Sequence, residues 1–136
     1  MADPKRVVAD WRHDLVFEGG AVGRPTVVLD GDAAAGPSPM EALLLALAAC
    51  TGSDVVSILR KKRADLQGFR VEVVGERRDE HPRRYTAITV RYHVRAPALD
   101  PEHARRAIEL SLERYCSVTH SIAGDIVVRH ELLLDA

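Results

Sequence analysis

The segment EALLLALAACTGSDVV, residues 41–56, decides how the rest of the sequence is interpreted. A stretch so rich in Ala and Leu predicts a helix, because these residues are strong helix formers. The apolar side chains lie on all sides of such a helix, so that one sheet face cannot cover them all. We therefore predict that a partner subunit covers part of it. The apolar run ends at Cys50, and four polar or small residues, Thr51, Gly52, Ser53 and Asp54, follow at once.

The residues just before this segment predict where the helix begins. Ser38 fits the N-cap, Pro39 the first helical position, and Glu41 the acidic position of a capping box. We expect a break or bend near Gly52, because glycine weakens a helix interior, and a second helical start at Asp54.

The remaining sequence predicts strands around two helices. Residues 5–18 and 24–31 favour short strands separated by a glycine turn at 18–23. Residues 69–78 and 85–96 alternate between apolar and polar side chains, which predicts an antiparallel hairpin. Asp100 and Pro101 begin a second helix that ends at Cys116, and residues 126–134 form a last strand. The order of elements is typical of an α+β fold.

The composition limits the kind of protein. The 136 residues predict a single domain, 1–136, with 46% hydrophobic and 29% charged residues. A net charge of −1 and an aromatic content of 4% disfavour nucleic-acid binding. We see no apolar signal segment at the N-terminus, and the longest apolar run, 42–50, is far shorter than a membrane span. We therefore expect a cytoplasmic protein with no membrane partner, whose thiols are kept reduced.

The two cysteines, Cys50 and Cys116, are the main candidates for chemistry. Cysteine is among the most buried residue types, so both can be inert core residues. No CxxC spacing supports a thioredoxin motif or a zinc site. Cys50 is nevertheless followed by hydroxyl residues and an acid, and Cys116, in RYCSVTHS, also leads into polar residues. If the two helices pack together, one thiol can attack a substrate and the other can resolve the product as a disulfide.

A reactive cysteine needs help from a neighbouring charge, because an unperturbed thiol has a pKa of about 8.5. Arginine is the usual partner, and Arg24 and Arg114 are candidates together with the arginines of the strands. Glu41 can orient such an arginine, although the capping box already explains it. The six histidines follow no metal-binding spacing, and no nucleotide motif is present, so we expect neither a metal nor a cofactor.

Three segments resemble the OsmC/Ohr family of osmotically inducible and organic hydroperoxide resistance proteins. GPSPMEALLLALAACTGSDVVSIL resembles the family's central helix, and GERRDEHPRRYTAITVRYHV resembles the hairpin after it. RAIELSLERYCSVTHSI resembles the helix with the family's second cysteine. The pairing of SPxE…AAC with YCSV is more specific than either motif, and the likeness is strongest from about Gly36 onward.

The resemblance implies an OsmC-like fold, in which antiparallel sheets wrap around a long central apolar helix, in an intertwined homodimer. It implies thiol-dependent reduction of organic hydroperoxides. Cys50 would be the peroxidatic nucleophile and Cys116 would form a disulfide with it. A dithiol reductant, lipoyl-linked in one branch of the family, would then restore both thiols.

The sequence departs from the hydroperoxide-resistance branch at two positions. Met40 stands where that branch has its catalytic glutamate, and Glu41 comes one residue later. Ala21 stands where the branch has an arginine after its Gly-Gly turn, and the nearest arginine is Arg24. The chain therefore resembles the broader OsmC-like group. Two alternatives to a peroxidase stay open: a redox-sensing or apolar-ligand-binding dimer on the same fold, and a structural domain with inert thiols.

Overall fold

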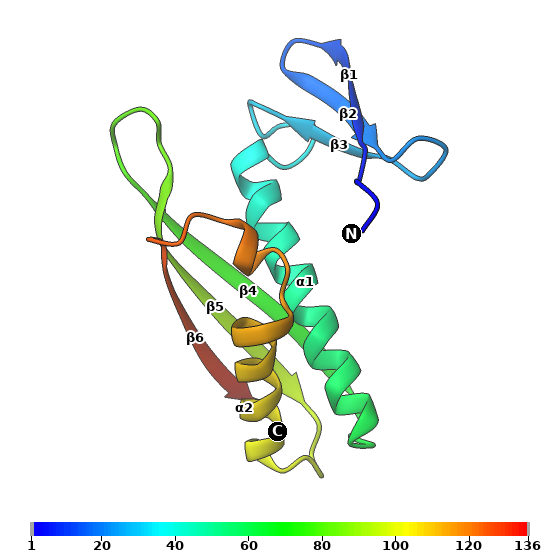
Figure 1. Ribbon diagram of the computed structural model, residues 1–136, viewed down its shortest axis with the longest axis vertical. Coiled ribbons are helices and arrows are strands. Elements are labelled where there is room, and N and C mark those ends of the chain that lie inside the picture. Colours follow the sequence, from blue (N-terminus) through cyan, green and yellow to red (C-terminus); the bar gives the residue numbers. More distant parts are fainter. Residues whose placement is uncertain (1, 136) are drawn as a thin grey trace. The chain divides into compact units, whose positions relative to one another are not determined.

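A computed structural model describes residues 2–135 (Figure 1). The chain forms two compact units, Met1–Leu43 and Leu44–Ala136. We call them the first and the second unit and describe each by itself. The helix predicted from residues 41–56 begins in the first unit and continues through the second.

The first unit contains a three-stranded antiparallel sheet in the order β1 (Val8–His13), β2 (Val16–Gly20), β3 (Val27–Asp30). The predicted turn at 18–23 is partly wrong, because Gly19 and Gly20 belong to β2. A side chain at Gly19 would collide with the backbone of β1, so this glycine allows two strands to approach closely. The turn follows at Ala21–Arg24, where the N–H of Arg24 donates to the carbonyl of Ala21 at 3.1 Å.

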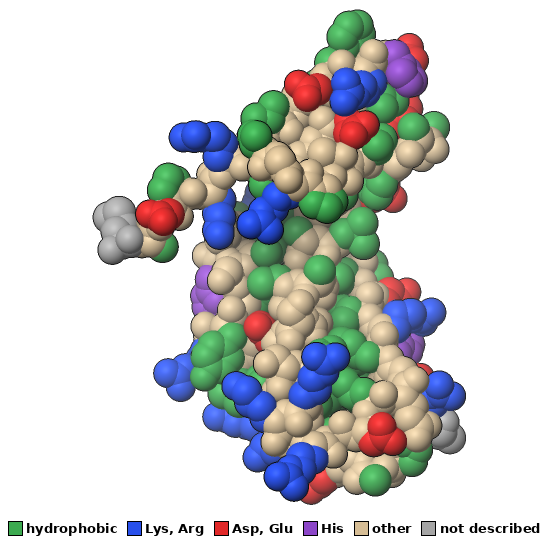
Figure 2. Space-filling model, turned by 90° about the vertical axis from the view of Figure 1, so that its right-hand side faces the viewer, with side chains coloured by type: hydrophobic (Ala, Val, Ile, Leu, Met, Phe, Trp, Pro, Cys, Tyr) green, Lys and Arg blue, Asp and Glu red, His purple; other side chains and the backbone are tan. Residues whose placement is uncertain are grey.

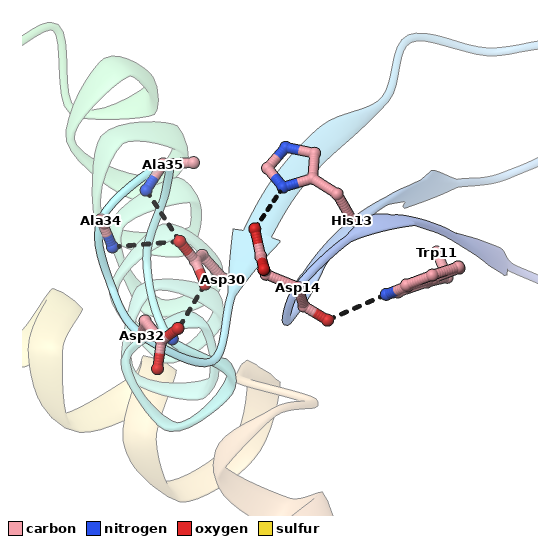
Figure 3. A network of polar contacts seen from close by, with 7 residues as sticks. All are labelled: Trp11, His13, Asp14, Asp30, Asp32, Ala34 and Ala35. Atoms are coloured by element: carbon pink, nitrogen blue, oxygen red, sulfur yellow. Dashed lines mark hydrogen bonds and ion pairs between the residues drawn. The ribbon is translucent and has the colours of Figure 1, made fainter.

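Asp30, at the end of β3, organises the loop that leads to the helix (Figure 3). Its buried carboxylate accepts the backbone N–H groups of Asp32, Ala34 and Ala35 at 2.9, 3.2 and 2.9 Å. These hydrogen bonds, with that from Ala35 the largest cause, lower the pKa of Asp30. The loop therefore depends on an ionised carboxylate.

The hairpin between β1 and β2 has its own polar contacts, also drawn in Figure 3. The indole N–H of Trp11 donates to the carbonyl of Asp14 at 2.9 Å. The His13 ring lies 2.8 Å from the Asp14 carboxylate, which fixes the two-residue turn from both sides.

The helix α1 (Pro39–Lys61) confirms the predicted start. The N–H of Ser38 donates to the Glu41 carboxylate at 2.9 Å, and the N–H of Glu41 donates to the Ser38 hydroxyl at 3.1 Å. The predicted break near Gly52 is wrong, because α1 is continuous to Lys61. A Cβ atom at Gly52 would stand 3.4 Å from Val71 and 3.5 Å from Phe69, so this glycine packs closely on the sheet.

The second unit contains a sheet in the order β4 (Gly68–Arg77), β5 (Tyr85–Arg95), β6 (Val127–Leu134). The predicted hairpin is confirmed, since β4 and β5 are antiparallel. The expectation of purely antiparallel sheets is wrong, because β5 and β6 are parallel. A helical crossover between them, beginning with α2 (Pro101–Leu110), returns the chain to the end of the sheet where β5 begins (Figure 1).

Asp100 caps α2, because its carboxylate accepts the N–H of Glu102 at 3.0 Å and Pro101 follows it directly. The core lies between the helices and the buried face of the central strand β5. It is made of apolar residues that are at most 2% exposed: Leu47, Val55, Leu59, Ile88, Val90, Tyr92, Val94, Ala104, Ala107 and Ile108. Burial of a Leu, Ile or Val side chain contributes about 1.5–3 kcal/mol, so this cluster holds α1 and α2 on the sheet.

Candidate active site

The two cysteines come together in the second unit. Cys50 lies half-buried on α1, and Cys116 is fully buried at the residue where the second helical segment ends. Both are free thiols. Burial raises the pKa of the Cys116 thiol, the hydroxyl and N–H of Thr119 lower it, and a hydrogen bond with the neighbouring Cys50 thiol raises it again. Cys116 is thus a buried, protonated thiol next to a more accessible one.

The backbone that carries Cys116 has an unusual geometry. After α2 the chain widens into a π-helical turn, η1 (Ser111–Tyr115), in which the N–H of Cys116 donates to the carbonyl of Ser111 at 2.7 Å. Wide turns of this kind are rare and occur frequently at functional sites. The helix predicted to run to Cys116 therefore ends as regular α-helix at Leu110.

A 3₁₀ turn, η2 (Thr119–Ser121), follows and supports the same segment. The ring of His120 makes a hydrogen bond of 3.2 Å with the carbonyl of Leu112 inside the π-turn. The Thr119 hydroxyl is buried and has no hydrogen-bond partner of ordinary geometry in the described part of the chain. That hydroxyl is therefore available to the Cys116 sulfur when the latter ionises.

A chain of four polar side chains crosses the buried space beside the cysteines. Thr51 makes hydrogen bonds of 2.7 Å with the Tyr92 hydroxyl and 2.7 Å with the Ser111 hydroxyl. Ser111 donates to the Asp54 carboxylate at 2.8 Å. We call Tyr92, Thr51, Ser111 and Asp54 the hydroxyl chain. The pKa of Tyr92 is raised to about 12, mainly because burial removes its hydroxyl from water. The hydroxyl therefore keeps its proton at neutral pH and can donate it.

Sequence reasoning missed the hydroxyl chain, because its members come from three elements. The sequence predicts a second helical start at Asp54, and it places Tyr92 only within the alternating segment 85–96. The available signal was Ser111, a hydroxyl residue on the otherwise apolar side of the second helix. A polar residue at a core position requires a partner, and this requirement points to a buried network.

The other predicted site residues, Arg24 and Glu41, belong to the first unit. Arg24 is exposed in the turn between β2 and β3. The Glu41 carboxylate is held in the capping box, where the backbone and hydroxyl of Ser38 lower its pKa. Arg114 is exposed within η1. The basic run 60–63 is exposed at the end of α1, as expected for a solvated helix end.

Among residues 2–135, no group of three or more His, Cys, Asp or Glu residues is placed to hold a metal ion. The His13 ring pairs with Asp14, and the His93 ring lies 3.5 Å from the Arg70 guanidinium.

One side of α1 is left open beside β4. A groove of about 830 Å³ runs along it, and Figure 2 shows hydrophobic side chains on this face with Lys and Arg side chains gathered toward the end of α1. The groove is lined by Leu45, Ala48, Ala49, Gly52, Ser53, Val56, Ser57, Arg60, Lys61, Phe69 and Val71. By length and composition alone α1 could also cross a membrane, but Leu47, Thr51, Val55 and Leu59, which do not line the groove, are buried within the folded second unit.

Comparisons with known proteins agree with this architecture. The family model described as OsmC-like protein matches residues 30–131. Protein YhfA of Escherichia coli strain K12 is 36% identical over 121 residues, which cover 88% of this chain and 90% of YhfA. A crystal structure of a hypothetical protein from Aquifex aeolicus is 26% identical, has a TM-score of 0.84, and aligns over 99% of this chain and 100% of that one.

A more distant structure is that of the organic hydroperoxide resistance protein OhrB of Bacillus subtilis. It is 21% identical, has a TM-score of 0.60, and aligns over 96% of this chain and 98% of OhrB. At this identity the likeness concerns the fold. The family match extends over most of the sequence, from Asp30 at the end of β3 to Glu131 in β6, and includes both cysteines. The chain belongs to the OsmC-like protein family.

Proposed function

We propose that this protein is a thiol-dependent peroxidase that reduces organic hydroperoxides to alcohols. The observation that carries the proposal is the pair of neighbouring free thiols with unequal burial, Cys50 half-buried and Cys116 fully buried. Membership of the OsmC-like family, and a fold shared with an organic hydroperoxide resistance protein, support the same chemistry.

The unequal burial supports different roles for the two cysteines. A hydroperoxide must reach the attacking sulfur, and only Cys50 has exposed surface. Its thiolate attacks the terminal peroxide oxygen, the O–O bond breaks, and the alkoxide takes a proton to give the alcohol. Cys50 becomes a sulfenic acid. The Cys116 sulfur then attacks Cys50, the S–S bond forms, and the hydroxyl group leaves with the Cys116 proton as water.

A reductant must return two electrons to complete the cycle. An external dithiol attacks the more exposed sulfur of the disulfide, that of Cys50, and Cys116 leaves as the thiolate. The buried hydroxyl and N–H of Thr119 favour that thiolate. In this proposal the reductant is a dithiol of the lipoyl type, and the reaction takes place in the cytoplasm, where thiols are kept reduced.

The proposal includes a homodimer. The groove along α1 exposes apolar residues to solvent, with Leu45 57% exposed. An apolar patch of this kind on a soluble protein is typical of an interaction surface. A second copy of the chain covers it, and the apolar surroundings of α1 then favour an alkyl hydroperoxide over hydrogen peroxide.

Arg24 is proposed as the cation that favours the Cys50 thiolate, and Glu41 as the acid that orients it. The capping box already occupies the Glu41 carboxylate, so its contribution is the smaller one. Replacement of Arg24 by Ala is expected to slow the reaction of Cys50 with hydroperoxide without changing the disulfide step.

The alternative is a redox-sensing or apolar-ligand-binding dimer with little turnover. Met40 and Ala21, at the positions where the hydroperoxide-resistance branch has its acid and its arginine, favour this alternative. The open groove of α1 is a site where an apolar ligand would fit.

Mass spectrometry after one equivalent of cumene hydroperoxide tests the proposal. The wild-type protein should lose two hydrogens and contain a Cys50–Cys116 disulfide, Cys116→Ser should stop at a sulfenic acid on Cys50, and Cys50→Ser should not react. Steady-state turnover with dihydrolipoamide then separates a peroxidase from a sensor. Absence of any oxidation at Cys50 would exclude both functions and leave the thiols structural.

A further inference from the structure

We propose that Thr51 and Ser111 are positioning residues for the disulfide step: the hydroxyl chain fastens the π-turn that carries Cys116 to α1 beside Cys50. The inference rests on the proposed function and adds residues that neither react nor contact the hydroperoxide. It concerns only the second chemical step, in which Cys116 must reach Cys50.

The hydroxyl chain has one direction of donation, which follows from its acidic end. Ser111 donates its single hydroxyl proton to a carboxylate oxygen of Asp54. Thr51 must then donate to Ser111, and Tyr92 must donate to Thr51. Each hydroxyl makes the one donation available to it, and the three hydrogen bonds are 2.7, 2.7 and 2.8 Å long. A fully satisfied buried network of this kind is rigid.

The hydroxyl chain is attached directly to both cysteines. On α1, Thr51 is the residue after Cys50, and Asp54 lies one helical turn further along. On the other side, the Ser111 carbonyl accepts the N–H of Cys116 at 2.7 Å. Ser111 therefore holds the backbone of Cys116 with its carbonyl and holds α1 with its hydroxyl. Within η1, Ser111 is thus the residue whose hydroxyl joins the turn to Thr51 and Asp54 of α1.

The geometry of disulfide formation explains why it is useful to hold the π-turn on α1. A disulfide needs sulfurs about 2.05 Å apart and Cβ atoms about 3.8 Å apart, with a restricted dihedral angle. A misplacement of about 1 Å between reacting groups can slow a reaction roughly 100-fold. The π-turn is a single irregular turn at the end of α2, and the side-chain hydrogen bonds of Ser111 tie it to α1. The attack of Cys50 on hydroperoxide does not involve Cys116 and should not depend on the hydroxyl chain.

The test separates the two steps by rapid mixing with cumene hydroperoxide, followed by dimedone trapping for the sulfenic acid and mass spectrometry for the disulfide. Thr51→Val keeps the shape and removes the hydroxyl, whereas Thr51→Ser keeps the hydroxyl. Ser111→Ala removes the central link. Thr89→Val, on the opposite face of β5, is the matched control for the Thr-to-Val change.

We expect Thr51→Val and Ser111→Ala to form the sulfenic acid at the wild-type rate but the disulfide at least about tenfold more slowly. Thr51→Ser should restore most of the disulfide rate, and Thr89→Val should match the wild type. Equal slowing by Thr51→Ser and Thr51→Val, or an unchanged disulfide step in Ser111→Ala, would overturn the inference. Far-UV circular dichroism verifies that each variant is folded.

Diamide oxidation distinguishes a failure of this inference from a failure of the proposed function. Diamide forms the Cys50–Cys116 disulfide without any hydroperoxide, so the positioning effect should persist even if wild-type Cys50 proves unreactive toward hydroperoxides. If a Thr51→Val protein does not fold, Tyr92→Phe removes only the outer end of the hydroxyl chain and gives the same comparison. Disulfide formation in Tyr92→Phe should be slowed less than in Ser111→Ala. A greater slowing in Tyr92→Phe than in Ser111→Ala would contradict the proposed positioning role.

Discussion

The free energy of unfolding offers a quantitative check on the hydroxyl chain, through the variants Tyr92→Phe and Thr51→Val and their combination. Tyr92→Phe removes one buried hydrogen bond and leaves Thr51 still donating to Ser111. The expected loss is about 1 kcal/mol. Thr51→Val removes two hydrogen bonds and leaves the Tyr92 hydroxyl buried without an acceptor, because Tyr92 is fully buried. The expected loss is about 2–3 kcal/mol.

The double variant should lose less than the sum of the two single variants. Once Tyr92 is Phe, the Thr51→Val change no longer leaves a hydroxyl without an acceptor, so we expect a coupling free energy of about 1 kcal/mol. Urea unfolding of the reduced protein, followed by circular dichroism at one fixed protein concentration, measures all four forms. If the free-energy loss of the double variant equals the sum of the two single losses to within about 0.3 kcal/mol, the proposed hydroxyl chain is refuted, because independent sites are additive.

Three further predictions concern other parts of the molecule. Ser38→Ala should destabilise the protein by about 1 kcal/mol in urea unfolding, because it removes one half of the capping box. The pKa of Asp30 is lowered in the folded state, so its stabilisation is present above about pH 3.9, the unfolded pKa, and is lost as the pH falls through the folded pKa. Asp30→Asn should therefore lose stability at neutral pH and show a flatter acid dependence of the melting temperature. Ala49→Arg, in the groove of α1, should convert a dimer to a monomer in sedimentation, whereas the exposed control Lys62→Ala should not.

Local features of the fold could be predicted from the sequence, because they depend on neighbouring residues. The capping box of Ser38 and Glu41 and the alternation of the β4–β5 hairpin are examples. The continuity of α1 through Gly52 was missed, since it depends on contacts with β4 that helix propensity does not include. The parallel direction of β6 was also missed, because the residues of a single strand do not show in which direction it pairs with its neighbour.

In the candidate site, too, local features could be predicted from the sequence and features that depend on tertiary contacts could not. The two cysteines stood out in the sequence because each leads directly into polar residues. The π-turn and the hydroxyl chain did not, because Thr51, Tyr92 and Ser111 are distant in the sequence and meet only after the sheet and both helices have packed. Each of them alone is an ordinary hydroxyl residue, and their function as a group is visible only in three dimensions.

The parallel pairing of β5 with β6 has a consequence for how the protein is made. The ribosome completes β5 well before β6, because the whole α2 crossover lies between them. During that interval the strand with the most buried face of the second unit has one unpaired edge. An open edge of this kind is a template for other chains. The nascent protein is therefore most prone to aggregate just before β6 emerges, and that is when binding by a chaperone would protect it best.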